Sequence, residues 1–352
     1  MNLKGYPKMT RILYGIAKEG MGHAVRSKVI INELEKKHKV LILAGGKQYS
    51  YLSSIFGNVI RIEDFDLTYV NNSISFTLTF LRNLLRSPLI IYSLIKNISK
   101  IRKYDPDIII SDFEPLSNYL SYFLRKPLIA IDNQHIITKC KITCPKKFKK
   151  DFIISYLTIS AIITNARYFI VNSFISLKPK VKNVFVVNPI IRPEIIQHQT
   201  TDMKHIIVYQ TSDSNNKLIP ILKKTHYSYI FYGDKKGKEQ NITFKKFCEK
   251  EFIEDLASCS GVITNGGFGL ISEALYLKKP VLSIPIRKQF EQILNALHLK
   301  MYGYGSYSLH TTENAINSFI KNLPTYRKNL SRYKKYDNKV IFDKLNQIIS
   351  SS

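Results

Sequence analysis

Residues 261–275 read Gly-Val-Ile-Thr-Asn-Gly-Gly-Phe-Gly-Leu-Ile-Ser-Glu-Ala-Leu, and this stretch is the most informative about the fold. A short β-branched run is followed by a tight glycine turn and then by residues with helical spacing. Glycines let the backbone of such a turn approach a ligand, and the free N–H groups of the following helix attract anions. The stretch predicts a strand–turn–helix unit with an anion site suited to a diphosphate.

The same pattern extends along both halves of the chain. Short β-branched runs alternate with segments of helical period, which is typical of βαβ units around a parallel sheet. Strands are expected at Arg11–Ala17, Val40–Ala44, Asp107–Ser111, Leu128–Ile131, Tyr168–Val171, Val184–Val187, His205–Gln210, Tyr229–Tyr232, Gly261–Thr264 and Val281–Pro285. Helices are expected at Ala24–Lys37, Ser272–Leu277 and Gln289–Met301, among others.

The alternation breaks near Asn188–Glu194, where two prolines flank a short stretch before the polar segment Gln197–Lys204. A length of 352 residues suits two domains rather than one. We therefore predict an α/β protein of two Rossmann-like domains facing a central cleft, residues 1–190 and 200–322. Residues 323–352 are expected to form a helical tail that packs on the N-terminal domain.

The net charge of +27 favours anionic partners: nucleic acid, an anionic membrane face or phosphorylated small molecules. Part of the lysine excess reflects a general bias in composition. Four scattered cysteines indicate reduced thiols in a cytoplasmic protein. The sequence shows neither a signal peptide nor a run of roughly 18 to 20 apolar residues that could span a bilayer.

The segment Phe76–Tyr104 is both apolar and basic. Such a segment predicts a basic amphipathic helix pair lying on an anionic bilayer surface. A buried helix with solvated lysines explains the pattern equally well, so the sequence leaves both interpretations open.

Nearer the N-terminus, a first glycine turn follows the first expected strand, in residues 15–23, Gly-Ile-Ala-Lys-Glu-Gly-Met-Gly-His. The absence of an acid after the second strand argues against a dinucleotide site, and the lack of Gly-Lys-Ser/Thr argues against a P-loop. His23 stands at the start of the next helix, where it could accept a proton from a hydroxyl if a carboxylate held its other ring nitrogen. Asp112 is the candidate partner; the alternative is that His23 only caps the helix.

The stretch 261–275 continues through Lys-Pro-Val-Leu-Ser-Ile-Pro at 279–285 and Gln-Phe-Glu-Gln-Ile-Leu-Asn-Ala at 289–296. Together these residues resemble the nucleotide-sugar site of inverting GT-B glycosyltransferases, the family of the peptidoglycan N-acetylglucosaminyltransferase MurG and the UDP-glucuronosyltransferases. The resemblance is strongest to microbial members with Glu-Gly-Met-Gly-His near the start and Asn-Gly-Gly-Phe later.

This resemblance implies a role for each matching residue. His23 would be the base, Gly266 and Gly267 would bind the diphosphate, and Glu273 would hold the ribose. The other implied donor-binding residues are Thr211, Ser212, Phe268, Glu291 and Gln292, the last two for the sugar. Residues on the acceptor side would be Glu19, Gly20, Gly22, Asn133, Gln134 and His135.

Three features depart from the family pattern. The chain has no tryptophan, so the base-stacking Trp of plant-type relatives is missing, and a backbone contact near Phe247–Ile253 could serve instead. The first loop has fewer glycines than in MurG enzymes, which leaves the acceptor class open. Asp64-Phe65-Asp66 looks like the metal-binding Asp-x-Asp of the other glycosyltransferase fold, but the GT-B fold handles the leaving diphosphate with helix dipoles. We therefore expect no metal and no cofactor.

The resemblance implies an inverting, metal-independent glycosyltransferase, with the acceptor bound by the N-terminal domain and a nucleotide-sugar donor, a UDP-sugar, by the C-terminal domain. The apolar and basic segment Phe76–Tyr104, rather than the resemblance, suggests that the acceptor is a hydroxyl of a lipid-linked or cell-surface glycan. We expect the enzyme to be cytoplasmic and peripheral on the inner membrane face. A UDP-sugar epimerase or hydrolase of the same fold is the alternative. A polyanion- or nucleic-acid-binding protein ranks last, because the lysines look spread along the chain and no nucleic-acid module is present.

Overall fold

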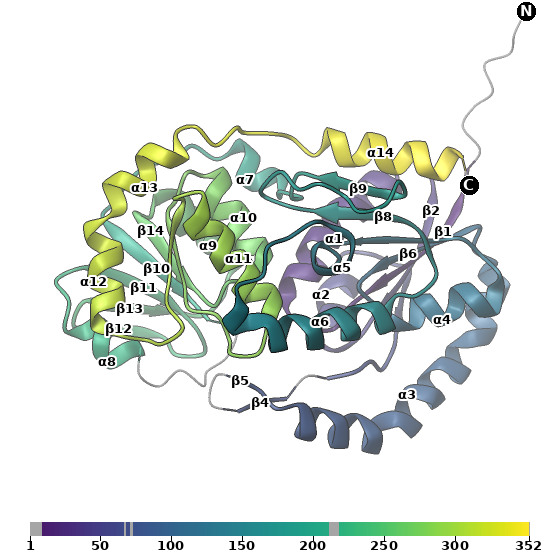
Figure 1. Ribbon diagram of the computed structural model, residues 1–352. Coiled ribbons are helices and arrows are strands. Elements are labelled where there is room, and N and C mark those ends of the chain that lie inside the picture. The colour runs from purple at the N-terminus through teal and green to yellow at the C-terminus, as the bar shows by residue number, and fades with distance from the viewer. Residues whose placement is uncertain (1–8, 67, 71–72, 211–217, 352) are drawn as a thin grey trace, which may run out of the picture. The chain divides into compact units, whose positions relative to one another are not determined.

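The computed structural model describes residues 9–66, 68–70, 73–210 and 218–351 (Figure 1). The chain divides into two compact units. The first unit comprises Met1–Thr68, Phe76–Ile190 and Asn338–Ser352, and the second comprises Tyr69–Ser75 and Ile191–Asp337. Each unit is built around its own seven-stranded sheet.

The first unit contains an entirely parallel sheet with the strand order β3-β2-β1-β6-β7-β8-β9. Its strands are β1 (Arg11–Ile16), β2 (Lys39–Ala44), β3 (Val59–Arg61), β6 (Ile108–Asp112), β7 (Leu128–Asp132), β8 (Ala166–Asn172) and β9 (Val184–Val187). The expected strands of this half are confirmed to within two residues at each end. Only β3 was not predicted, because three residues carry too short a pattern.

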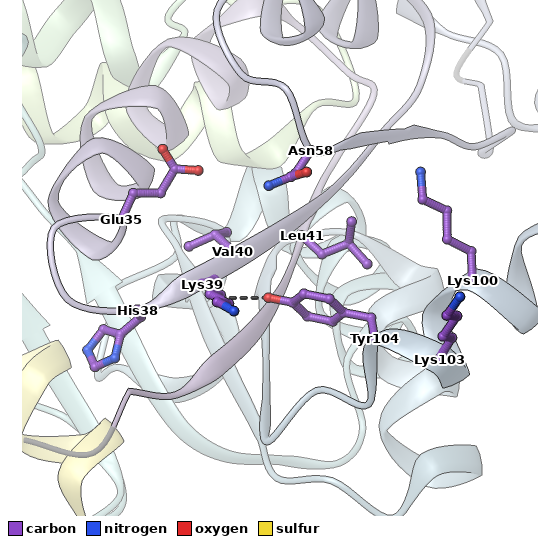
Figure 2. Close-up of a pocket in the computed structure, with 9 residues that line it drawn as sticks. All are labelled: Glu35, His38, Lys39, Val40, Leu41, Asn58, Lys100, Lys103 and Tyr104. Atoms are coloured by element: carbon purple, nitrogen blue, oxygen red, sulfur yellow. Dashed lines mark hydrogen bonds between the residues drawn. The ribbon is translucent and has the colours of Figure 1, made fainter.

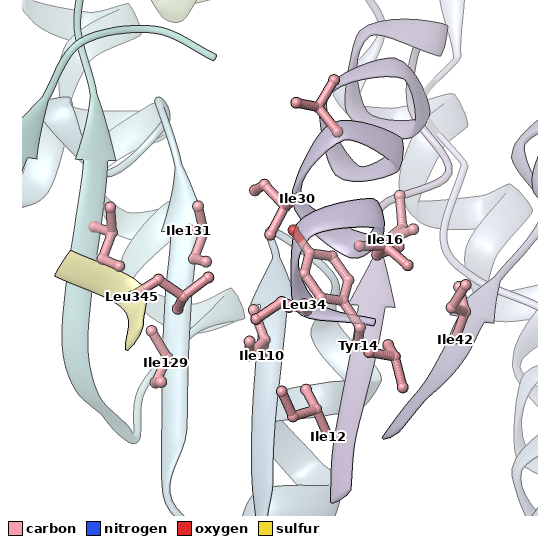
Figure 3. Close-up of a cluster of buried hydrophobic side chains, with 14 of the residues drawn as sticks. Ile12, Tyr14, Ile16, Ile30, Leu34, Ile42, Ile110, Ile129, Ile131 and Leu345 are labelled. Atoms are coloured by element: carbon pink, nitrogen blue, oxygen red, sulfur yellow. The ribbon is translucent and has the colours of Figure 1, made fainter. Parts of the chain in front are cut away.

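One face of this sheet packs against α1 (Met21–Leu34), α2 (Gly46–Ser53) and α14 (Lys339–Ser350). Figure 3 shows Tyr14 and Ile110 of the strands together with Ile30 of α1 and Leu345 of α14. The strands are nearly continuous apolar runs because both faces of a parallel sheet are covered.

The remaining helices of the first unit are α3 (Phe76–Tyr104), α4 (Pro115–Leu124), α5 (Ile136–Lys139) and α6 (Lys149–Ile162). A Cβ on Gly15 would collide with Ser117 Oγ of α4, so α4 lies against the face opposite to Tyr14 and requires glycine in β1.

The segment Phe76–Tyr104 forms one continuous helix, so the expected helix pair is wrong. Pro88 lies inside the helix without ending it. Ile90 and Ile101 are buried, but most large apolar side chains of α3 face solvent, namely Leu78, Phe80, Leu81, Leu84, Leu85, Leu89, Ile91, Tyr92 and Ile95. The buried-helix interpretation is therefore also wrong. Among the described residues, no helix is both long and apolar enough to cross a membrane.

The second unit has a sheet with the order β12-β13-β11-β10-β14-β15-β16, parallel except for the β12–β13 hairpin. Its strands are β10 (His205–Tyr209), β11 (Ser228–Tyr232), β12 (Gly237–Glu239), β13 (Ile242–Lys245), β14 (Gly261–Thr264), β15 (Val281–Ser283) and β16 (Gly305–Tyr307), and a small hairpin pairs β4 (Tyr69–Val70) with β5 (Ser73–Ile74). Its helices are α7 (Pro193–Gln197), α8 (Leu218–Lys223), α9 (Glu249–Ser258), α10 (Phe268–Tyr276), α11 (Phe290–Met301), α12 (Glu313–Lys321) and α13 (Leu323–Leu330).

The C-terminal tail is divided between the units. The helix α13 is part of the second unit, whereas α14 buries Ile341 and Leu345 in the core of the first. Only the last part of the expected tail, residues 338–352, therefore packs on the N-terminal unit.

Candidate active site

His23 lies in the first turn of α1, directly after the glycine turn that ends β1. Gly20 precedes the helix with a φ of 75°, a conformation that favours glycine. Asp112 ends β6, the strand beside β1, and its Oδ1 atom lies 2.7 Å from His23 Nδ1. The structure thus brings the expected pair together.

Two further residues of α1, not predicted from the sequence, hold Asp112. Arg26 Nε and Ser27 Oγ each donate to Asp112 Oδ2 at 2.8 Å, and Arg26 Nη2 contacts Oδ1. Burial alone would raise the pKa of Asp112, but the charge and hydrogen bonds of Arg26, together with His23, hold it well below its usual range. Arg26 and Ser27 follow His23 by three and four residues, so helical spacing could have revealed them.

The network defines the protonation of the imidazole. An ionised carboxylate only accepts hydrogen bonds, so His23 Nδ1 carries the proton that it donates to Asp112. The Arg26 Nη2 atom near the same nitrogen then directs its hydrogen atoms to the carboxylate. The other ring nitrogen, His23 Nε2, then accepts a hydrogen bond from Gln134 Nε2 at 3.3 Å, and its lone pair is the basic site of the ring.

The loop after β7 places two of its three expected acceptor-side residues beside this pair. Asn133 Oδ1 accepts from Arg26 Nη1 at 2.8 Å, and Gln134 lies next to His23. His135 instead donates its Nδ1 proton to Asp132 Oδ2 at 2.6 Å, and its ring packs at an angle of 55° to that of Phe169.

The other acceptor-side residues lie in the first glycine turn. Gly20 and Gly22 are both exposed, and a Cβ on either would meet no atom within 4 Å. Glu19 precedes them and is partly exposed. Gln48 Nε2 donates to the Gly20 carbonyl at 3.2 Å and to that of Lys18, which holds the turn in place.

In the second unit the glycine turn joins β14 to α10. Gly266 has a φ of 102°, and a Cβ there would lie 2.7 Å from Ser283 Oγ, so the position requires glycine. Gly267 is the N-cap of α10, and a Cβ on it would meet no atom within 4 Å. The space beside Gly267 at the start of this helix is therefore open, as an anion site needs. The Phe268 side chain is buried and can contribute only its backbone.

Glu273, the expected ribose ligand, is engaged by an arginine that the sequence did not single out. Arg192 Nε and Nη2 donate to the two carboxylate oxygens at 2.6 Å each, and Arg192 Nη1 donates to Glu249 at 3.0 Å. Burial would lower the pKa of Arg192, but the paired carboxylates raise it. Arg192 belongs to the proline-flanked segment that was interpreted from its sequence as a linker, so its role at Glu273 was not predicted.

The remaining expected donor residues differ in their surroundings. Gln292 is buried, and its Oε1 accepts from the Ile286 N–H at 3.0 Å, so part of its amide supports the turn after β15. Glu291 is in the first turn of α11 and partly exposed. Thr211 and Ser212 lie outside the described residues.

An aromatic cluster stands at the carboxyl ends of β10 and β11. The ring of Phe247 is 49% exposed and lies 5.4 Å from that of Phe252 and 6.3 Å from that of Tyr209. The segment expected to offer a backbone contact thus also presents an aromatic face.

The Asp-x-Asp segment has its carboxylates occupied within the protein. Asp66 Oδ1 pairs with Lys18 Nζ at 2.8 Å, and Asp66 Oδ2 pairs with Arg86. Asp64 is buried and accepts from the Phe65 N–H at 2.7 Å. In the described part of the chain, no group of three His, Cys, Asp or Glu side chains could hold a metal ion.

A hollow of about 660 Å³ lies elsewhere in the first unit (Figure 2). It is found where β2 begins, next to His38 and Tyr104, whose hydroxyl donates to the Lys39 carbonyl at 2.7 Å. The candidate residues follow the opposite, carboxyl ends of the strands, and none of them lines this hollow.

The comparisons with known proteins agree with this architecture. The family model described as Glycosyl transferase family 1 matches residues 10–324. The chain is 31% identical over 132 residues to UDP-N-acetylglucosamine--N-acetylmuramyl-(pentapeptide) pyrophosphoryl-undecaprenol N-acetylglucosamine transferase 3 of Bacillus cereus, which covers 32% of this chain and 37% of that protein. The transferase of the same name, without the number, from Staphylococcus epidermidis is 27% identical over 181 residues, 43% of this chain and 50% of that one. The matches thus span half or less of these relatives.

Solved structures share the fold at low identity. A UDP-glucosyltransferase from Polygonum tinctorium is 14% identical with a TM-score of 0.69, covering 99% of this chain and 100% of that one. The kitacinnamycin glycotransferase is 14% identical with a TM-score of 0.64, covering 93% and 94%. With the family model spanning both sheets, the chain belongs to glycosyl transferase family 1 and has the two Rossmann-like domains of the GT-B fold.

Proposed function

We propose that the protein is an inverting, metal-independent glycosyltransferase that moves a sugar from a UDP-sugar to an acceptor hydroxyl. The observation that carries this proposal is the His23–Asp112 pair at the carboxyl edge of the first sheet. The acceptor hydroxyl would take the place of Gln134 Nε2 as the hydrogen-bond donor to His23 Nε2, which would act as the base. The family match and the nucleotide-sugar names of the relatives support it.

The reaction would be a single displacement. His23 Nε2 takes the proton of the acceptor hydroxyl as its oxygen forms a bond to the anomeric carbon of the donor sugar. The bond from that carbon to the diphosphate oxygen breaks, and the nucleoside diphosphate leaves from the opposite side, which inverts the anomeric centre. Asp112 stabilises the imidazolium that forms, and Arg26 keeps Asp112 ionised.

The second unit would bind the donor. The N–H groups at Gly266, Gly267 and the start of α10 would hold the diphosphate and stabilise it as it leaves. Each oxygen of Glu273 accepts one hydrogen bond from Arg192 and retains a further lone pair for a ribose hydroxyl. Glu291 and Gln292 would bind the sugar, Thr211 and Ser212 would be a second phosphate contact, and Phe247 would stack on the base.

The first unit would bind the acceptor, with Asn133 and Gln134 beside the base. The names of the relatives suggest a lipid-linked acceptor. The exposed apolar side chains of α3 suit association with a membrane surface, which would make the enzyme cytoplasmic and peripheral on the inner face.

A donor screen tests the proposal. Isothermal calorimetry of the full chain with UDP-, dTDP- and GDP-sugars should show that the UDP-sugars bind, and Gly267→Val should abolish that binding. Product analysis with a lipid-linked acceptor should then show transfer with inversion. Binding of none of the nucleotides would refute the proposal, and turnover of the donor without an acceptor would favour a hydrolase or epimerase.

A further inference from the structure

A dense group of lysines forms where two segments of the first unit meet. Residues 139–150 and 178–182 run side by side: the Lys141 N–H donates to the Lys178 carbonyl at 2.9 Å, and the Lys180 N–H donates to the Lys139 carbonyl at 2.8 Å. Nine of these 17 residues are lysines and none is acidic, whereas 53 of the 352 residues of the chain are lysine or arginine. We call this group the lysine platform; it comprises Lys139, Lys141, Lys146, Lys147, Lys149, Lys150, Lys178, Lys180 and Lys182. The expectation that the lysines are spread along the chain is therefore wrong.

The platform lacks neutralising partners. Within the described residues, none of the nine ammonium groups has a carboxylate within 4.0 Å, although lysines elsewhere in the unit pair with acids, as Lys18 does with Asp66. The nearest acid in sequence, Asp151, stands alone beside nine cations. The surface thus has strong positive charge that only an external anion can compensate.

The centre of the platform contains polar groups that are not satisfied within the protein. Lys180 Nζ donates to the Thr138 carbonyl at 3.0 Å, while the buried Thr138 Oγ1 has no hydrogen-bond partner in the described structure. Burial, and then the charge of Lys180, lower the pKa of Lys139, so the two ammonium groups repel each other. An external anion beside Lys139 and Lys180 would relieve this repulsion.

Exposed apolar side chains border these charges. The helix α6 begins inside the platform at Lys149 and exposes the aliphatic side chains of Ile153 and Leu157, and Val181 is exposed between Lys180 and Lys182. The one exposed aromatic side chain of this helix among the described residues, Tyr156, has its ring covered by Lys180 at 5.6 Å. Nucleic acids and soluble polyanions gain from phosphate contacts and aromatic stacking but not from exposed aliphatic groups. A bilayer surface uses both, because the aliphatic groups enter the boundary of headgroups and acyl chains while the lysines meet the phosphates.

We propose that the lysine platform, with Ile153, Leu157 and Val181 at its border, docks the first unit on the phosphate headgroups of an anionic bilayer. This contact would be additional to the proposed membrane contact of α3, and different residues form it. The inference rests on the proposed function only for its purpose, which is to hold the enzyme where a lipid-linked acceptor lies.

The test is sedimentation of the full chain with vesicles of phosphatidylcholine alone or of phosphatidylcholine and phosphatidylglycerol in equal parts. The platform variant carries Lys141→Gln, Lys146→Gln, Lys178→Gln and Lys182→Gln. Its matched control removes the same charge from exposed lysines of the second unit, with Lys236→Gln, Lys238→Gln, Lys321→Gln and Lys328→Gln. Because each lysine at an anionic surface contributes roughly fivefold, the platform variant should lose about a hundredfold or more in affinity for the anionic vesicles.

The fold-loss in affinity of the control variant for the anionic vesicles should be less than a tenth of that of the platform variant. The wild-type chain should bind phosphatidylcholine vesicles only weakly. Equal losses in both variants would show that net charge alone acts, and no loss in the platform variant would equally overturn the proposal. Binding of inorganic polyphosphate or duplex DNA as tight as that of the anionic vesicles, with no loss on Leu157→Ser, would assign the platform to a soluble polyanion instead.

Two further measurements distinguish this proposal from membrane contact by α3 and from the proposed function. An α3 variant, Leu85→Ser with Leu89→Ser, should keep the preference for anionic over neutral vesicles, since the platform is intact. Calorimetry with UDP should give the same affinity for the platform variant and the wild-type chain. If UDP does not bind at all, the proposed function fails. The vesicle experiment would still test whether the lysine platform binds an anionic bilayer.

Discussion

Asp112 and His23 are 89 residues apart in the sequence, yet the carboxylate Oδ1 lies 2.7 Å from the imidazole Nδ1. The contact forms because β6 pairs with β1 in a register that sets Asp112 opposite Ile16, just before the turn that leads to α1. Arg26 and Ser27 complete the shell around the carboxylate. The arrangement fixes the tautomer of the imidazole, and the proposal that His23 is the base leads to the first prediction.

Replacing His23 with Ala should lower the turnover number by about 10²–10⁴-fold, because general-base help is worth that much. Donor affinity should change little, since His23 is in the first unit and the residues proposed to bind the donor are in the second. Steady-state rates and calorimetry with the nucleotide measure the two effects separately. A turnover number equal to that of the wild-type enzyme would remove His23 from its role.

Arg26→Leu should destabilise the protein by about 3 kcal/mol or more, because it leaves a fully buried carboxylate without its cationic partner. The double variant Arg26→Leu/Asp112→Asn should recover part of that loss, since no uncompensated charge remains. Urea unfolding of the wild-type protein and the two variants gives the comparison. Equal losses in the single and double variants would mean that Arg26 stabilises the fold through packing alone.

The two glycines of the donor turn should respond differently to alanine. Gly266→Ala forces an alanine into a positive φ and towards Ser283, so it should cost about 1–3 kcal/mol of stability. Gly267→Ala meets open space and should leave thermal unfolding unchanged, while it weakens nucleotide binding by occupying the space of the diphosphate. Unchanged affinity in a stable Gly267→Ala protein would place the diphosphate elsewhere.

Phe247→Ala should weaken nucleotide binding by about 1–3 kcal/mol, the usual contribution of stacking a base on an aromatic ring. Met203→Ala, an exposed apolar truncation in the same unit, is the matched control and should have no effect. Calorimetry with the nucleoside diphosphate measures both variants. Similar affinities for the two variants would show that the base does not contact Phe247.

His298 should make stability depend on pH in the mildly acidic range. Burial lowers the pKa of His298 from 6.5 to about 4, so the unfolded chain takes up a proton near pH 6.5 that the folded chain refuses. The free energy of unfolding should therefore fall between pH 6.5 and pH 4, by up to about 3 kcal/mol from this group. The difference between wild type and His298→Gln, followed by urea unfolding across this range, isolates the effect. A constant difference would show that the folded protein protonates His298 as readily as the unfolded chain does.

Much of the fold followed from local patterns. The expected core strands and the helix after each glycine turn are present, and the second-unit strands that were not predicted, β4, β5, β12, β13 and β16, have only two to four residues each. The prediction for the C-terminal tail was only partly right, because α13 has a helical pattern like that of α14 but packs in the second unit. Helical period does not reveal which core a helix joins.

The candidate site was less predictable. The positions of His23 and Asp112 at the ends of strands suggested their contact, but Arg26 looked like any surface arginine of a helix. Arg192 looked like part of a linker, although it holds Glu273 from 81 residues away. His135 belongs to the same loop as Gln134, yet its bond to Asp132 turns it to a different environment.

The sequence alone determined the alternation of strands and helices, the division into two Rossmann-like domains and the two glycine turns. These features depend on the spacing of apolar residues and on the backbone freedom of glycine, and both are encoded within about fifteen neighbouring residues. The tertiary structure alone decided which charges meet: Arg26 with Asp112, Arg192 with Glu273, and residues 139–150 with 178–182. Such contacts depend on the register of strands that are distant in the chain, and that register is set by the packing of the whole sheet.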